Sequence, residues 1–278
     1  MPTFRIVLAY DGTGFVGWQR QANGVSIQGL IEEALCALEG RDVTVTGAGR
    51  TDAGVHALGQ VASFTLAREL EPDAVARALN GCLPRAIRVT AAESAPPDFH
   101  PRFTARNKTY RYRLWNHEVM SPFEREYAWH VPGPLDVEAM GAAARLLEGR
   151  HDFAAFQATG SSVSTTVREV AVSRIVDCGL RTGEESVIES AIESTIKSAI
   201  RNPQSAMLTY EVVGSGFLRH MVRIIVGSLV EIGRGRQPVA WMSEVIASRD
   251  RTLAGPTAPP HGLFLVGIEY PDALAARS

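Results

Sequence analysis

The chain has 278 residues, of which 45% are hydrophobic and 21% charged, so it is long enough for two packed lobes whose core needs no disulfides. Its formal net charge of −2 excludes a uniformly basic surface, and any nucleic-acid contact must therefore come from local clusters of cations. Three scattered cysteines, no apolar run long enough to span a bilayer and no visible signal peptide predict a cytoplasmic protein.

The first hundred residues predict a unit with four strands and two helices. Apolar residues recur every three to four positions after Ser26, which is a typical helix cap. The predicted elements are a strand over 4–10, a helix over 26–38, strands over 43–47 and 60–66, a helix from Pro72 to about residue 81, and a strand over 87–92. This β-α-β-β-α-β order is that of a ferredoxin-like unit.

A proline-bearing stretch over 95–101 predicts a lobe boundary, with one lobe over 1–100 and a second over 101–278. The second lobe again combines strands and helices. Its predicted elements are a strand over 108–115, a helix capped by Asp136 that runs to Gly149, strands over 167–176 and 206–213, helices over 217–232 and 239–248, and a last strand over 263–270. Isoleucine recurs every fourth position over 184–200, which predicts either a surface helix or a poorly ordered insertion without chemistry.

The densest cluster of chemically useful residues is the loop over 47–57. Its glycines allow close approach of a ligand, and Arg50 lies two residues from Asp52. A carboxylate beside a guanidinium stays ionised, which suits nucleophilic or electrostatic work better than proton donation. From the residues alone a structural turn with an internal Asp–Arg pair is the favoured interpretation, by about two to one. His56 lacks further ligands at metal-site spacing and is interpreted as a hydrogen-bonding residue that shapes the loop.

Five motifs that follow one another along the chain resemble those of the TruA-type tRNA pseudouridine synthases. The resemblance extends from residue 4 to residue 270, and several ordered motifs are more specific than any one of them. The motifs are Tyr10–Gln19, Arg50–Ala57 followed by Gln60, Lys108–Tyr112, Gly214–Arg223 with Val226 and Gly227 behind it, and Gly262–Leu265.

This resemblance implies a role for individual residues. Asp52 is expected to be the nucleophile that allows the bond between uracil and ribose to break, and Arg50 to hold the flipped-out nucleotide. Tyr110 is expected to stack under the target uracil, and Arg223 to pair with Asp52 and keep it charged. Leu265 or its neighbour Leu263 is expected to form the apolar wall of the pocket. Attack on the ribose, attack on the uracil ring and a glycal route all stay open for Asp52.

The resemblance also implies a fold, a substrate and an assembly. The expected fold is α+β, the pseudouridine synthase fold, with two ferredoxin-like lobes whose antiparallel sheets meet at a central basic cleft. The expected substrate is uridine at positions 38 to 40 in the anticodon stem-loop of tRNA, bound by a homodimer. No cofactor and no metal are expected, because the isomerisation is redox-neutral.

Elementary physical chemistry agrees with a base-flipping enzyme. Extruding a base costs a few kcal/mol, and stacking it on an aromatic ring returns roughly 1–3 kcal/mol. In the strand over 108–115, Tyr110 and Tyr112 share one face, while Arg111 and Arg113 share the other and could meet phosphate or an acidic neighbour. Without the resemblance, an ordinary core tyrosine is the preferred interpretation of Tyr110.

Two groups of basic residues could line a phosphate-binding cleft, although about half of their members are expected to form solvated faces or salt bridges. They are Arg102, Arg106, Lys108, Arg111 and Arg113, and Arg219, His220, Arg223, Arg234 and Arg236.

Two features depart from the family pattern. Ile224 stands where the family usually has asparagine, and residues near 183–204 look inserted between two strands. The main rival hypothesis is a non-catalytic tRNA-binding protein or RNA chaperone on the same fold. A metal-dependent nuclease is the more distant rival, because it would need several clustered carboxylates where the loop offers one.

Overall fold

The computed structural model describes residues 1–160, 163–177 and 206–271. The predicted insertion near 183–204, with its isoleucine repeat, lies outside the described residues. Within the described ranges we find no helix with the length and apolarity that crossing a membrane requires.

The described chain folds into helices and strands that confirm the α+β class. The strands are β1 (Thr3–Tyr10), β2 (Thr46–Gly47), β3 (His56–Thr65), β4 (Ile87–Ala95), β5 (Asn107–Trp115), β6 (Trp129–His130), β7 (Gly149–Asp152), β8 (Val167–Asp177), β9 (Met207–Gly214) and β10 (Leu263–Glu269). The helices are α1 (Ile27–Glu39), α2 (Pro72–Cys82), α3 (Val137–Arg145), α5 (Met221–Gly233) and α6 (Trp241–Ser248).

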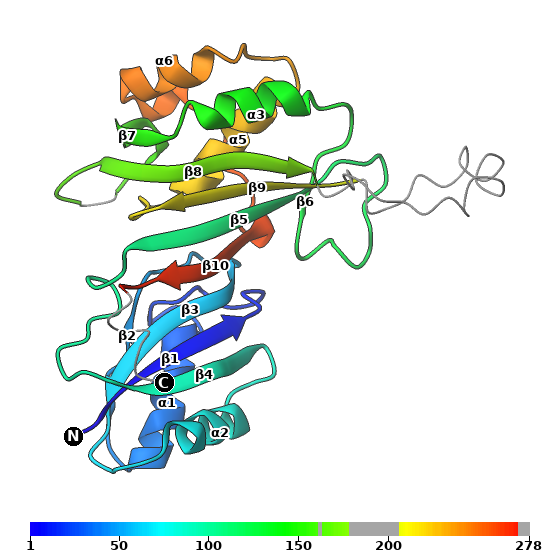
Figure 1. The fold of residues 1–278 in the computed structure, drawn as a ribbon. Helices are drawn as coiled ribbons and strands as arrows, with labels where there is room; N and C mark the ends of the chain where they lie inside the picture. Colours follow the sequence, from blue (N-terminus) through cyan, green and yellow to red (C-terminus); the bar gives the residue numbers. More distant parts are fainter. Residues whose placement is uncertain (161–162, 178–205, 272–278) are drawn as a thin grey trace, which may run out of the picture.

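All these strands join in one sheet, whose main path is β4-β1-β3-β10-β5-β9-β8-β7 (Figure 1). The sheet contains the same arrangement twice, with β2 beside β3 and off the main path. The strands β4-β1-β3-β2 and the strands β10-β5-β9-β8 each pair antiparallel in that order, which is the order of a ferredoxin-like unit. The two units join through β3 and β10, which pair in parallel.

The junction depends on the shortness of β2. This strand pairs only with Ala62 and Ser63, near the end of β3, and the chain then leaves the sheet. The start of β3 is therefore free to pair with β10, where Phe264 lies opposite His56 and Leu265 opposite Ala57. As a result, the loop that carries Asp52 emerges where the two units meet.

Local capping signals place the helices much as the sequence predicts. The Ser26 hydroxyl accepts a hydrogen bond from the Gly29 N–H at the start of α1, and Gly40 ends that helix with φ 78°. Pro72 opens α2, and the Asp136 carboxylate accepts from the Ala139 N–H at the start of α3.

Several predicted boundaries are wrong. The strand predicted over 60–66 begins already at His56 as β3, and the strand predicted over 87–92 extends to Ala95 as β4. The helix predicted from Phe217 begins only at Met221, because the preceding residue, His220, has φ 62°, which no α-helix accommodates. The strand predicted over 43–47 is reduced to the two residues of β2, because the loop begins there. The helix that starts after Asp136 ends at Arg145 and not at Gly149, because β7 begins at Gly149 after a turn over 146–147.

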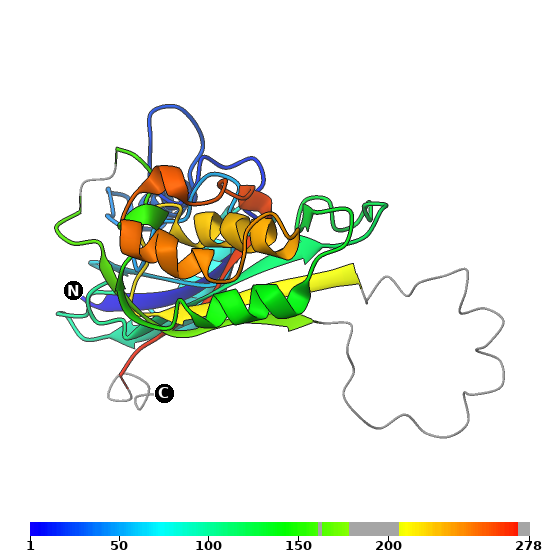
Figure 2. The ribbon, with the colours of Figure 1, turned by 90° about the horizontal axis from the view of Figure 1, so that it is seen from above.

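A continuous hydrophobic cluster runs from the first unit to the second, from Phe4 and Ile6 through Leu265 to Ile225. The helices α1 and α2 accompany the β4–β1 end of the sheet, and α3, α5 and α6 accompany the β8 end (Figures 1 and 2). Ile224 is fully buried in α5, so this departure from the family pattern faces the core.

Candidate active site

The loop between β2 and β3 that carries Asp52 is fixed by hydrogen bonds from two buried side chains of the sheet. Gln60 Nε2 donates to the Gly49 carbonyl oxygen over 2.9 Å, and Tyr10 Oη lies 2.9 Å from Thr51 Oγ1. Burial raises the pKa of Tyr10 to about 12, so its hydroxyl keeps its proton at neutral pH. A satisfied buried network of this kind holds the loop in one conformation.

The opening motif over 10–19 packs against the same loop and leaves no room for side chains at two of its glycines. A Cβ atom at Gly12 would lie 2.1 Å from the Val55 carbonyl oxygen. A Cβ atom at Gly17, which has φ 103°, would lie 2.5 Å from the Thr51 carbonyl oxygen. Two motifs far apart in the sequence therefore form one structural unit around Asp52.

The Asp52 carboxylate is held through one of its two oxygens. Arg223 Nη1 lies 3.3 Å from Oδ2, and His220 Nε2 lies 3.5 Å from the same atom. Arg223 also donates from Nε to the Ala258 carbonyl oxygen over 2.8 Å, which fixes the guanidinium plane. Among the described residues Oδ1 has no hydrogen-bond partner, and the carboxylate is 30% exposed, so this oxygen is free to meet a substrate.

The sequence predicts His220 only as a member of a basic group and does not predict its position beside Asp52. Its left-handed backbone turns the chain into α5, so that both His220 and Arg223 come from the start of that helix, where the helix dipole also favours a negative charge. Burial lowers the pKa of His220, although the charge of Asp52 opposes this shift. No local sequence signal marks a histidine for a positive φ.

Tyr110 lies on β5 with 8% of its surface exposed. Its ring meets the Phe217 ring edge to face, with the centroids 5.1 Å apart. Burial raises the pKa of Tyr110, and the nearby charges of Tyr10 and Asp52 add to the rise. Within the described part of the chain the Tyr110 hydroxyl has no hydrogen-bond partner. Tyr110 thus lies close enough to Asp52 to feel its charge, and its hydroxyl is left without a partner among the described residues.

Leu265 lies directly opposite Tyr110 in the pairing of β10 with β5, and it is fully buried. Its neighbour Leu263 lies opposite Tyr112 and is also buried. Leu265 therefore packs at the junction between Ala57 of β3 and Tyr110 of β5.

Arg50 does not form the internal pair with Asp52 that the turn interpretation requires. Its side chain is exposed, and it has no ion-pair partner among the described residues. The structure thus brings Asp52, Arg223, Tyr110 and Leu265 together and leaves Arg50 open to solvent at the edge of the group.

Several of the predicted basic residues meet acidic neighbours instead of an open surface. Arg111 Nε lies 2.7 Å from Glu211 Oε2, and Arg113 Nη2 lies 2.8 Å from Glu124 Oε2. Glu211 also forms an ion pair with Arg174. Arg234 and Arg236 both approach Glu231. These arginines are structural.

Other cations near the loop have no carboxylate partner among the described residues. Lys108 Nζ donates to the Ala48 carbonyl oxygen over 2.8 Å, and burial, with a smaller effect of the Arg102 charge, lowers the pKa of Lys108 to about 8. Arg168 donates to backbone carbonyls, and its pKa is lowered by burial and again by Arg102. Arg102, Lys108 and Arg168 therefore form one group, which we call the basic edge.

His56 has the loop-shaping role that the sequence suggests. It is 1% exposed, and the Gly12 N–H donates to its Nδ1 over 3.0 Å. Its Nε2 lies 3.1 Å from the carbonyl oxygens of Glu126 and of His261. Because Nδ1 accepts, the proton sits on Nε2, and burial lowers the pKa of His56 despite the nearby Asp11. The ring ties together three segments that are distant in sequence.

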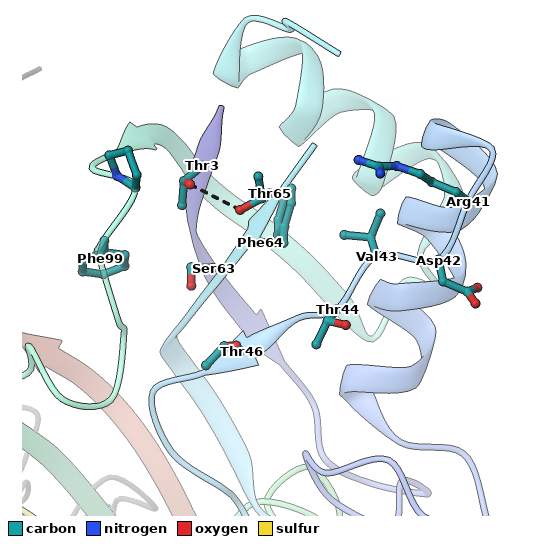
Figure 3. A pocket seen from close by; sticks show the side chains of 11 residues that line it. Thr3, Arg41, Asp42, Val43, Thr44, Thr46, Ser63, Phe64, Thr65 and Phe99 are labelled. Atoms are coloured by element: carbon teal, nitrogen blue, oxygen red, sulfur yellow. Dashed lines mark hydrogen bonds between the residues drawn. The ribbon is translucent and has the colours of Figure 1, made fainter. Parts of the chain in front are cut away.

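A separate hollow of about 360 Å³ lies at the other end of β3 (Figure 3). It is wide open, and threonine and serine side chains contribute much of its lining, together with Arg41 and Asp42. Because Asp52 lies beyond the start of β3 and this hollow lies at its end, the hollow does not belong to the Asp52 group.

Across the ranges that the structure describes, no three His, Cys, Asp or Glu side chains gather as a metal site would require. The nuclease hypothesis, which needs clustered carboxylates, gains no support from this arrangement.

Comparisons with known proteins agree with one class of enzyme, which acts on tRNA. A family model described as tRNA pseudouridine synthase matches residues 6–104 and 143–271. A protein of Myxococcus xanthus named tRNA pseudouridine synthase A is 45% identical over the whole of this chain and 96% of its own length. Proteins of the same name from Syntrophotalea carbinolica and Geobacter sulfurreducens are 44% and 42% identical, each over 97% of this chain and over 97% and 100% of their own lengths.

The chain therefore belongs to the tRNA pseudouridine synthase family and is an isomerase that acts on tRNA.

Proposed function

We propose that this enzyme converts uridine to pseudouridine at positions 38 to 40 in the anticodon stem-loop of tRNA, with Asp52 as its nucleophile. The observation that carries the proposal is the asymmetry of the Asp52 carboxylate. Its Oδ2 lies 3.3 Å from Arg223 Nη1, while Oδ1 has no partner among the described residues. The guanidinium stabilises the negative charge, and the free oxygen is suited to attack.

The neighbours of Asp52 support the handling of an extruded base. Tyr110 offers an aromatic ring whose stacking with uracil would return roughly 1–3 kcal/mol of the extrusion cost. Arg223 keeps the carboxylate aimed, because its second hydrogen bond to the Ala258 carbonyl fixes its own position. Leu265 supplies the apolar wall behind Tyr110, and the exposed Arg50 is placed to hold the flipped nucleotide.

A basic cleft between two lobes, over 1–100 and 101–278, is the proposed surface for the tRNA backbone. The basic edge supports it, because Arg102, Lys108 and Arg168 have no carboxylate partner among the described residues and Lys108 contacts the Asp52 loop. Arg219 is exposed beside His220 and adds a further cation. Phosphates neutralised by such residues would make tRNA binding strongly dependent on salt.

The proposal includes a homodimer that binds one tRNA across both subunits, a cytoplasmic location and no cofactor. Cys36 and Cys82 are free thiols, which fits a reducing compartment. Rearranging uridine to pseudouridine is an isomerisation with no net oxidation or reduction, so the reaction requires no redox partner.

The decisive experiment uses an unmodified tRNA transcript with uridines in its anticodon arm. Wild-type protein, Asp52→Asn and the control Asp42→Asn are each incubated with it, and pseudouridine is mapped by carbodiimide labelling and primer extension. Asp42 is an exposed carboxylate in the hollow at the far end of β3. We expect stops in the anticodon arm with wild type and Asp42→Asn, and none with Asp52→Asn, which should still bind tRNA.

The rival hypothesis of a non-catalytic tRNA-binding protein predicts a different result. All three proteins would then bind the transcript equally and none would produce a stop. Stops with Asp52→Asn at the wild-type rate would remove Asp52 from the mechanism, and stops outside the anticodon arm would reassign the target region.

A further inference from the structure

The loop between β4 and β5 presents an aromatic ring to solvent. Phe103 is 77% exposed, although burying a phenyl ring would stabilise the fold. Although the ring protrudes, the loop that carries it is ordered. His100 Nδ1 accepts hydrogen bonds from the N–H groups of Arg102 and Phe103, the Thr104 N–H donates to the His100 carbonyl oxygen, and the Tyr270 hydroxyl holds the Pro101 carbonyl oxygen over 2.8 Å. The exposed ring is thus held on an ordered backbone.

Two side chains of the same loop flank the ring. The His100 and Phe103 ring centroids lie 4.3 Å apart with the planes inclined by 36°, and Arg102 Cζ lies 5.8 Å from the Phe103 centroid. An aromatic ring beside a guanidinium is the arrangement that stacks on a nucleobase and holds its phosphate.

The charges around Phe103 favour a polyanion over an apolar partner. Arg102 belongs to the basic edge with Lys108 and Arg168, and the exposed Arg106 follows in the same loop. None of these cations has a carboxylate partner among the described residues. A docking protein would require a contiguous apolar patch, whereas here a lone ring stands among cations.

The basic edge also connects this ring to the Asp52 loop. Lys108 Nζ reaches the Ala48 carbonyl oxygen at the start of that loop, so an RNA strand that crosses Lys108 passes from the Asp52 group towards Arg102 and Phe103. Tyr110, on the strand that begins beside Lys108, serves the target uridine in the proposed function.

We infer that Phe103 and Arg102 form a second stacking site, which takes an RNA base other than the target uridine and fixes the RNA strand as it enters the catalytic group. This inference rests on the proposed function for the identity of the RNA. The site adds affinity and register and takes no part in bond breaking.

The test compares Phe103→Leu, Phe103→Trp and Phe123→Leu in the full chain. Phe123 is a matched control, because it is 86% exposed but lies in a loop whose arginine is paired, with Glu124 bound to Arg113 and Glu126 to Arg125. Dissociation constants for the tRNA transcript are measured by filter binding at fixed salt, and kcat and KM are measured by pseudouridine formation.

We expect Phe103→Leu to raise Kd and KM by roughly tenfold or more while kcat stays within about threefold of wild type. Phe103→Trp should remain within about threefold of wild type in all three constants, because it keeps the stacking surface, and so should Phe123→Leu. The dependence of log Kd on log salt should keep its slope in Phe103→Leu and become shallower by about one ion in Arg102→Gln.

Each failure has a distinct meaning. If wild type forms pseudouridine and Phe103→Leu binds tRNA as wild type does, the stacking site is wrong and the proposed function stands. If wild type forms none but Phe103→Leu still weakens tRNA binding, the proposed function fails and the stacking site stands. Equal losses in Phe103→Leu and Phe123→Leu, or a change of sedimentation from dimer to monomer without a change in Kd, would overturn the inference.

Discussion

At the scale of single residues, the position of Asp52 depends on side chains that never touch it. Tyr10 and Gln60 hold the loop by hydrogen bonds, and Gly12 and Gly17 let the opening motif approach its backbone closely. A reacting group must be held to well below 1 Å. A small shift of this backbone is therefore expected to lower the reaction rate more than it lowers the stability of the fold.

Gly17→Ala tests this dependence. Its Cβ would lie 2.5 Å from the Thr51 carbonyl oxygen in a backbone with φ 103°, and we expect kcat to fall by roughly 10- to 100-fold while tRNA affinity changes little. The control is Gly14→Ala, which has φ 81° but nothing within 4 Å of its Cβ, so it carries backbone strain without displacing the loop. Both kcat values are measured on the transcript. Equal effects of the two substitutions would contradict the mechanism.

At the scale of elements, β10 is the strand that joins the two ferredoxin-like units of the sheet. It pairs in parallel with β3 of the first unit and antiparallel with β5 of the second. Its residue Leu265 lies between Ala57 and Tyr110 and is fully buried, so one side chain supports both the junction and the Tyr110 ring.

Leu265→Ala should therefore affect stability and activity together. Removing a fully buried leucine side chain is expected to lower the free energy of unfolding by about 2–5 kcal/mol and to reduce kcat, because Tyr110 loses its support. Urea unfolding and pseudouridine formation measure the two effects. Val266→Ala, half-buried on the same strand, should cost about 1 kcal/mol and leave kcat near wild type. A stability loss no larger than that of the control would contradict the role assigned to β10.

At the scale of the whole molecule, the site belongs to neither unit alone. The unit β4-β1-β3-β2 supplies the Asp52 loop, and the unit β10-β5-β9-β8 supplies Tyr110 and, through α5, Arg223 and His220. Three buried or half-buried histidines lie near this junction of the two units. His56, His220 and His261 all have pKa values that burial lowers.

This distribution predicts how stability depends on pH. Because the unfolded histidines protonate near pH 6.5 and the folded ones only at lower pH, the unfolded state binds more protons below pH 6.5. The free energy of unfolding should therefore be highest above pH 6.5 and fall as the pH drops, by up to about 1.4 kcal/mol per pH unit for each histidine. Asp11 and Glu211 act in the same direction at lower pH, because hydrogen bonds and ion pairs outweigh burial and lower their pKa values.

Urea unfolding at pH 7.5 and pH 5.5 measures the effect. His220→Asn should show a smaller loss than wild type between the two values, since asparagine tolerates the left-handed backbone of this position. Identical losses in the two proteins, or a gain in stability at pH 5.5, would show that the histidine does not act as assigned.

Much of the local structure could be predicted from the sequence, because the signals are local. The Ser26 cap, Pro72 at the start of α2 and the alternation along β5 all depend on neighbours within a few residues. The alternation along β5 also predicts that its two faces meet different surroundings. Its tyrosines are buried, and Arg111 and Arg113 found acidic partners, one of the two alternatives that the pattern allowed.

The rest depends on contacts that no local pattern specifies. The parallel pairing of β3 with β10 joins residues about two hundred positions apart, and nothing in either strand marks the other as its partner. The approach of His220 to Asp52 depends on a positive φ that histidine rarely adopts. The roles of Arg50, Tyr110, Arg223 and Leu265 stay predictions, because position alone does not demonstrate chemistry.

Arg223 lies 171 positions after Asp52, so the two residues are synthesised at different times. A ribosome that adds about 5–20 residues per second synthesises the Asp52 loop roughly 10–30 seconds before it adds Arg223. During that interval the start of β3 has no β10 beside it, and an unpaired strand edge of this kind invites association with other nascent chains. A chain released before residue 221 would carry Asp52 without His220's helix and without Arg223, the guanidinium that pairs with its carboxylate.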